Sequence, residues 1–195
     1  GWIEVNFNDY AVNPGWRVLM SDLGIRPGSV LKRDGLPQDL FALDKASISA
    51  EAHFRLWEAL VAEADDPLLP LHIGEAISTE AFDPPIFAAM CSPNLNVALS
   101  RIAKYKPLIG PMELHMEETS KSTRMALEWL DKTVVPPAPL LAMELVFFVR
   151  LARLGTRARI CPSEVTSPVR LTPASEYTKW FGVRVKQGEK ASITF

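Results

Sequence analysis

The chain of 195 residues is long enough for one domain, and a fold of this size buries roughly 70% of the surface of its unfolded chain. The chain has 21 Lys and Arg residues and 23 Asp and Glu residues, so its formal charge is −2. It therefore has no overall excess of positive charge that would attract the phosphates of a nucleic acid. Cys91 and Cys161 have neither CxxC nor Cys/His spacing, which argues against a disulfide framework and a structural zinc site and favours a reducing, cytoplasmic location.

The sequence predicts no association with a membrane. The longest apolar run, residues 140–149, is interrupted by Glu144 and is far shorter than the roughly 20 residues that cross a bilayer. No signal-peptide pattern opens the chain. Residues 1–15 have no clear period and receive no predicted structure, so we expect one domain over residues 16–195.

Gly and Pro divide the N-terminal third into predicted helices. Residues 16–23 form a short helix that Gly24 ends, and Pro27 stands where the first residue of a second helix often lies. Ser49 can cap a longer helix. That helix carries an apolar face at helical spacing, formed by Phe54, Trp57, Leu60, Val61 and Ala64.

Three more helices are predicted in the middle of the chain. The first starts at Asp66 and Pro67 and ends near Ile77, and the second starts at Pro84 and Pro85. The third has Ser92 as its cap and Pro93 in its first turn, and Pro107 ends it. Its apolar stripe is Leu95, Ala98, Leu99, Ile102 and Tyr105.

Beyond residue 111 the apolar period changes from helical to two. Residues 112–117 and 125–129 alternate between apolar and polar side chains, and residues 119–122 can turn the chain between them. This pattern is typical of an antiparallel β-hairpin with one solvent-exposed face.

The C-terminal part combines helices with short strands. Three prolines before residue 140 introduce a long, mostly buried helix that Gly155 closes. A strand over residues 168–171, a helix opened by Thr172 and Pro173, and a terminal strand pair follow. We therefore predict an α+β fold: a helix-rich single domain with an antiparallel hairpin and a small C-terminal antiparallel sheet.

Three stretches of this sequence resemble a known family. Residues 65–77 (DDPLLPLHIGEAI), residues 92–105 (SPNLNVALSRIAKY) and the terminal WFGVRV with its Gly turn and final Phe are similar to motifs of that family. The family is the N-terminal effector domain in the arabinose-binding-like branch of the AraC-type bacterial transcription regulators. The likeness extends from about residue 28 to residue 195.

The resemblance implies a domain that senses a small-molecule effector, forms a homodimer and contacts DNA only through a helix-turn-helix domain absent from this chain. The native reading frame should then continue beyond Phe195 for roughly another hundred residues. Two alternatives stay open: a stand-alone carrier of a hydrophobic small molecule or lipid, and a small hydrolase or isomerase. No GxSxG, HExxH or Walker-type pattern supports an enzyme, and no cofactor is expected.

The first strand of the predicted hairpin carries one candidate metal site. Glu113, His115 and Glu117 project from one face of the predicted hairpin and could offer three ligands. Alternating charges on the outer face of a hairpin are more often simply solvated, and we favour that interpretation. His53 and His72 are expected to be hydrogen-bonded structural residues.

Glu144 breaks the apolar pattern of the long helix, where it shares a face with Leu140, Phe147, Phe148 and Leu151. A buried carboxylate needs a partner. One reading is an ion pair with an arginine of a neighbouring element, such as Arg101 or Arg124. The other is that Glu144 points into a ligand cavity lined by aromatic side chains and orients a bound effector. The predicted ligand-binding set is Glu144, Phe87, Tyr105, Trp129, Phe147 and Phe148.

The same helix has a basic end. Arg150, Arg153, Arg157 and Arg159 lie on its last turns and in the loop after it. They could face the absent DNA-binding domain, but cations are also favoured at any solvated helix C-terminus because of the helix dipole.

Overall fold

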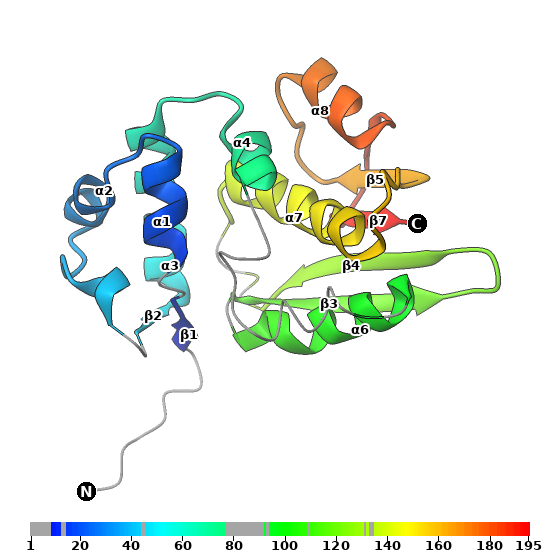
Figure 1. The fold of residues 1–195 in the computed structure, drawn as a ribbon, viewed down its shortest axis with the longest axis horizontal. Coiled ribbons are helices and arrows are strands. Elements are labelled where there is room, and N and C mark those ends of the chain that lie inside the picture. The colour runs from blue at the N-terminus through cyan, green and yellow to red at the C-terminus, as the bar shows by residue number, and fades with distance from the viewer. Residues whose placement is uncertain are drawn as a thin grey trace, which may run out of the picture.

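The computed structural model describes residues 9–12, 15–43, 46–76, 92, 94–108, 110–130, 132 and 135–195. Phe87 and the helix predicted from Pro85 onward lie outside these residues. Figure 1 shows the N-terminal helices at one end, the strands of the larger sheet toward the other, and α7 (Ala138–Thr156) through the middle. This arrangement confirms the α+β class. Among the described helices, none is long and apolar enough to span a membrane.

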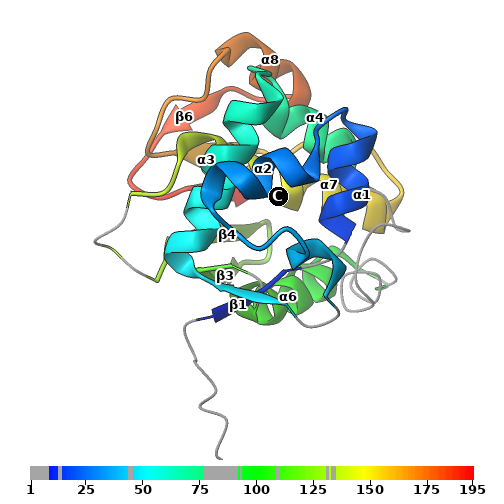
Figure 2. The same ribbon diagram turned by 90° about the vertical axis from the view of Figure 1, so that its left-hand side faces the viewer.

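The N-terminal end is a small helical layer. The helices α1 (Gly15–Asp22), α2 (Pro27–Asp34) and α3 (Ala50–Ala64) lie together there, in front of α7 when this end faces the viewer in Figure 2. A short 3-10 helix, η1 (Leu40–Ala42), precedes a two-stranded antiparallel sheet of β1 (Asp9–Ala11) and β2 (Ser47–Ser49).

Capping residues set the boundaries of these helices as the sequence predicts. Gly24 and Gly35 adopt positive φ angles of 75° and 66° just after α1 and α2, where a side chain would be strained. The Ser49 hydroxyl accepts a hydrogen bond from the Ala52 amide at 3.1 Å and caps α3.

The middle of the chain forms α4 (Leu69–Ala76), α6 (Leu95–Tyr105) and the 3-10 helix η2 (Lys106–Leu108). The cap of α6 differs from the prediction. Asn94, rather than Ser92, holds the capping position, and its side-chain oxygen accepts from the Val97 amide at 2.9 Å. Asn and Ser cap almost equally well, so spacing alone does not choose between them.

One five-stranded sheet unites the hairpin with the C-terminal strands, in the order β3-β4-β7-β5-β6. The predicted hairpin is confirmed as β3 (Met112–Glu118) paired with β4 (Thr123–Trp129) in antiparallel register. The other strands are β5 (Glu164–Ser167), β6 (Val185–Gln187) and β7 (Ser192–Thr194).

Two details of the C-terminal strands differ from the prediction. The strand expected over residues 168–171 lies earlier, because Pro168 has no N–H for the ladder and the Ser167 hydroxyl bonds to the Val169 backbone instead. The two terminal strands do not pair with each other: β5 lies between them and pairs with β6 in parallel. The helix α8 (Ala174–Phe181) supplies the crossover that this parallel pairing requires.

The core surrounds α7. Twelve of its residues, from Leu140 to Ala152, are buried, and α3, α4, α6 and β7 pack around it. The helix runs through Gly155, which was expected to close it, and ends where Arg157 adopts the left-handed conformation with φ of 53°.

A glycine allows α4 to pack closely on α7. A Cβ atom at Gly74 would lie 2.3 Å from Cγ1 of Val146, far inside van der Waals contact. The next residue, Glu75, accepts a hydrogen bond from Trp180 Nε1 at 2.6 Å and so connects α4 to α8. This Gly-Glu pair therefore sets the position of α4 against two other helices.

We predict that Gly74→Ala destabilises the domain by roughly 1–3 kcal/mol, because the added methyl group must push α4 away from α7. Chemical denaturation of both proteins measures the difference. Combining Gly74→Ala with Val146→Ala should cost less than the sum of the two single losses, since Val146 is the obstacle. Strictly additive losses would show that the close contact is unimportant.

Candidate functional site

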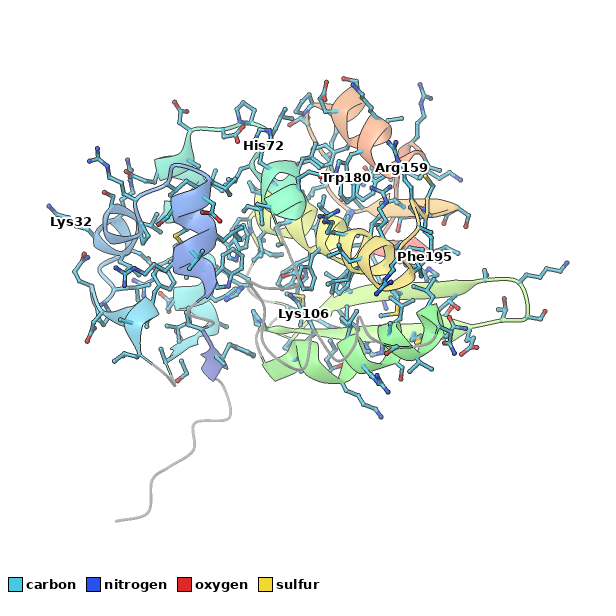
Figure 3. All side chains as sticks on the ribbon, in the orientation of Figure 1. Lys32, His72, Lys106, Arg159, Trp180 and Phe195 are labelled. Carbon is cyan, nitrogen blue, oxygen red and sulfur yellow. The ribbon has the colours of Figure 1, made fainter. Side chains whose placement is uncertain are left out.

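Two oppositely charged side chains are buried together in the domain interior. Lys106 is 6% exposed and Glu144 is 3% exposed. The Lys106 Nζ atom lies 2.8 Å from Glu144 Oε1 and 2.6 Å from Oε2. Both carboxylate oxygens therefore lie within hydrogen-bond distance of the ammonium, which donates to Oε1. Figure 3 shows Lys106 near the middle of the molecule, between α7 and the hairpin.

Local sequence brings each charge inside. Lys106 follows Ile102 by four residues, so it continues the buried stripe of α6. Pro107 then interrupts the α-helical pattern, and the chain passes into the tighter turn of η2 with Lys106 at its start. Glu144 faces it from the centre of α7, which is buried along most of its length.

An aromatic ring contacts the pair, and this ring packs against a second one. The Lys106 ammonium lies 4.9 Å from the centroid of the Phe147 ring, in cation–π contact. Phe147 packs edge-on against Phe148, with ring centroids 5.8 Å apart. On the α3 side, the rings of Phe54 and Trp129 approach to 5.5 Å.

His53 is a third polar group in this region. Burial, and then the positive charge of Lys106, lower the pKa of His53 to about 3, so the ring is neutral at physiological pH. The residue as a whole is half-buried, but its Nε2 atom is shielded from solvent and has no hydrogen-bond partner among the described residues. His72 behaves as the sequence suggests, with its Nδ1 atom 2.5 Å from Asp66 Oδ2.

The structure thus brings some of the predicted ligand-binding residues together. Glu144 and Phe147 both contact Lys106, and Trp129 packs against Phe54. Phe148 is completely buried and belongs to the core. Only the backbone of Tyr105 is described, where it ends α6, and Phe87 lies outside the described residues.

The partner of Glu144 was not foreseen. Lys106 occupies the place suggested for an arginine, while Arg124 lies 3.9 Å from Glu117 and Arg101 donates to the Ser92 hydroxyl. The signal was present in the sequence, because extending the stripe of α6 by one helical step places Lys106 on the buried face.

The exposed face of the hairpin carries an ion-pair network. His115 Nε2 lies 2.9 Å from Glu128 Oε2 and 3.6 Å from Glu113 Oε2, and Lys132 lies 3.2 Å from Glu128 Oε1. The side-chain hydrogen bond from Lys132 and the charge of Lys190 lower the pKa of Glu128. Within the described part of the chain, no three His, Cys, Asp or Glu side chains gather as a metal site would require.

The central arrangement offers an ammonium, a carboxylate and a neutral imidazole nitrogen in apolar surroundings. Such groups can bind and orient polar groups of a small ligand whose remaining surface is apolar. They do not form a nucleophile with an adjacent base, which covalent catalysis would need.

Comparison with known proteins identifies the family. Residues 24–195 match the family described as the arabinose-binding domain of AraC transcription regulator, N-terminal. The chain therefore belongs to this family of regulatory domains, and the resemblance seen in its sequence motifs is confirmed. The family is not one of enzymes.

A solved structure has the same fold. The crystal structure of the transcriptional regulator CdpR from Pseudomonas aeruginosa matches with a TM-score of 0.57 and 17% sequence identity. The match covers 100% of this chain and 56% of that chain. No match was found among curated proteins.

We predict that Glu144→Gln lowers the free energy of unfolding by roughly 3–5 kcal/mol, because it leaves the Lys106 ammonium buried without a counter-charge. Replacing both partners, as Lys106→Met with Glu144→Leu, should restore much of that stability. The exposed Glu113→Gln is the matched control and should change stability little. A Glu144→Gln protein as stable as the control would exclude a structural role for the pair.

A second prediction concerns acid stability. The unfolded chain protonates His53 below a pH of about 6.5, whereas the folded domain resists protonation down to a pH of about 3. Stability should therefore be fully present above pH 6.5 and fall as the pH drops through this window, by up to about 1.4 kcal/mol per pH unit. His53→Leu should flatten this dependence in denaturation series. Parallel curves for the two proteins would mean that His53 is not held neutral.

Proposed function

We propose that this chain is the effector-sensing and self-associating domain of a bacterial AraC-type transcription regulator. It would control a helix-turn-helix DNA-binding domain that lies outside the chain and makes the sequence-specific DNA contacts. Family membership over residues 24–195 supports this role. A cytoplasmic location belongs to the same proposal.

The buried Lys106–Glu144 pair supports an effector site at the domain centre. A buried ion pair often stabilises a fold no more than well-packed apolar side chains would, so stability alone is a weak reason for its presence. Recognition of a polar ligand group gives the pair a further role. Glu144, Trp129, Phe147 and Phe148 stay in the proposed ligand-binding set, joined by Lys106 and His53, while Phe87 and Tyr105 remain sequence predictions.

The pair also lies where a ligand could influence the whole domain. Lys106 begins η2, Glu144 lies in α7, and His53 lies in α3, so one bound molecule would touch three elements. A ligand shifts a conformational equilibrium only by binding its two states unequally. A ligand group that bonds to Lys106 or Glu144 would favour one packing of these elements over another and so change the attached domain's affinity for DNA.

The effector proposal can be tested on the chain purified from its bacterial host. Native mass spectrometry identifies a co-purified small molecule, and calorimetry measures its affinity for Glu144→Gln and for the Glu113→Gln control. Loss of a charge-assisted hydrogen bond should weaken binding about tenfold or more in Glu144→Gln alone. Equal affinities in both variants, each folded at the assay temperature, would place the effector elsewhere.

We further propose that α6 forms the homodimer contact. The long helix α7 is unsuited to this contact, because most of its residues are buried within the domain. A shallow groove of about 850 Å³ lies between α6 and the end of β3, with half-buried Leu95, Val97 and Met116 and a rim that includes Arg101 and Glu118. Most of the groove is lined by polar side chains, and these three apolar residues, called the apolar strip below, are the part suited to the centre of a subunit contact.

Light scattering at high protein concentration should give about twice the 21.6 kDa mass of one chain. Val97→Asp should shift the protein to monomer, because it places a charge in the apolar strip; near the start of α6 an acidic residue is compatible with the helix. Val18→Asp, at a 57% exposed position of α1, is the control and should remain dimeric. A monomeric wild-type chain would remove self-association from the proposal.

A further inference from the structure

Positive charge is concentrated at the C-terminal end of this slightly acidic chain. Residues 150–195 contain nine of the 21 Lys and Arg residues but only three of the 23 Asp and Glu residues. This quarter of the chain therefore carries a formal charge of +6, although the whole chain carries −2. Such asymmetry between parts of one chain points to a polyanionic partner.

Four of these basic residues line a single groove. The groove has a volume of about 470 Å³ and lies where the end of α7 meets α4 and α8. Its charged and aromatic lining residues are Arg150, Arg153, Arg157, Arg159, Glu75 and Trp180.

One of these arginines is structural. Arg153 donates from Nε to the Ile160 carbonyl and from Nη2 to the Trp180 carbonyl, each at 2.9 Å. Its guanidinium lies 4.5 Å from the centroid of the Trp180 ring, and burial lowers its pKa. Glu75 is also engaged, by Trp180 Nε1. The groove's one carboxylate is therefore already bonded.

Arg157 and Arg159 are different. Both are exposed, and neither has an acidic partner among the described residues. They lie in the loop that connects α7 to β5, and both line the groove. Two exposed guanidinium groups beside the Arg150 and Arg153 side chains of the same groove form a surface suited to an anion with several oxygens.

The chain keeps this surface near the last strand. The Ser163 amide donates to the Thr194 carbonyl at 2.8 Å. Arg159 precedes Ser163 by four residues, so it lies within about 14 Å of that point even along an extended chain. Figure 3 shows Arg159 and Phe195 toward one end of the molecule and Lys32 at the opposite end.

We propose that Arg157 and Arg159 bind phosphates of the DNA backbone beside the site read by the attached DNA-binding domain. The inference rests on the proposed function, in which that domain follows Phe195. DNA fits this surface better than the attached domain itself, because helix-turn-helix domains are basic and would be repelled by it. Two phosphate contacts are too few for the isolated chain to bind DNA well, but attachment to a bound domain raises the effective concentration of this surface.

The test uses the full-length regulator and a random-sequence duplex of about 30 base pairs, because non-specific binding depends on phosphate contacts. Fluorescence anisotropy gives the dissociation constant from about 50 to about 200 mM salt. Each lost phosphate contact lowers the slope of log K against log salt concentration by about 0.9. Arg157→Gln with Arg159→Gln should therefore reduce the slope by about 2 and weaken binding roughly tenfold per arginine near 0.1 M salt.

The control is Lys32→Gln with Lys121→Gln, which removes the same charge from exposed positions in α2 and the hairpin turn. This control variant should leave the slope unchanged. The variant Arg157→Lys with Arg159→Lys keeps both positive charges and should retain most of the wild-type slope. An unchanged slope in the arginine-to-glutamine variant, or an equal change in the control, overturns the inference while the proposed function stands. A full-length protein that binds no DNA overturns both. Residues 1–195 alone can also be titrated with inorganic phosphate. If they bind it saturably and the arginine-to-glutamine variant does not, the ligand of this surface is a small anion rather than DNA, and the inference is overturned.

Discussion

Burial of α7 on all sides is the constraint on which the rest of this domain depends. A helix that is apolar around its whole circumference needs neighbours in every direction. Here α4 approaches through Gly74, α3 and α6 cover other sides, and β7 contributes from the sheet. Because the helix has no solvent-facing stripe in its middle, its carboxylate at Glu144 is enclosed as well, and Lys106 has to enter the interior to neutralise it.

The same helix connects the ion pair to the end of the domain that carries the arginine-lined groove. Glu144 lies midway along α7, and Arg153 in its last turns bonds to the Trp180 carbonyl and stacks on the Trp180 ring. Trp180 in turn bonds to Glu75 of α4. These contacts form a continuous packed path. On the proposed function, a small displacement of α7 by an effector would therefore move α8 and the adjacent basic surface, which is the kind of rigid-element shift that regulatory domains use.

Local chemistry made much of the fold predictable from sequence. Gly24, Pro27 and Ser49 act through their own backbone neighbours, so the helix boundaries that they set were predicted correctly, and strict alternation fixed the hairpin. The order of strands could not be read in the same way, because placing β5 between β6 and β7 depends on contacts between distant segments. The candidate site shows the same difference between local signals, which the sequence reveals, and contacts between distant segments, which it does not. Glu144 stood out because it interrupts an apolar stripe, whereas Lys106 comes from another helix and its partnership with Glu144 is purely tertiary.

The most direct test of an effector site at this ion pair is the NMR signal of the Lys106 side-chain nitrogen, recorded before and after adding the co-purified small molecule. A ligand that bonds to Lys106 or Glu144 changes the charge and hydrogen bonding around that ammonium. The Lys106 signal should therefore shift, while the signals of exposed Lys32 and Lys121 stay in place. A saturating effector that leaves the Lys106 signal unmoved would contradict an effector site at the ion pair and reduce Lys106 and Glu144 to structural residues.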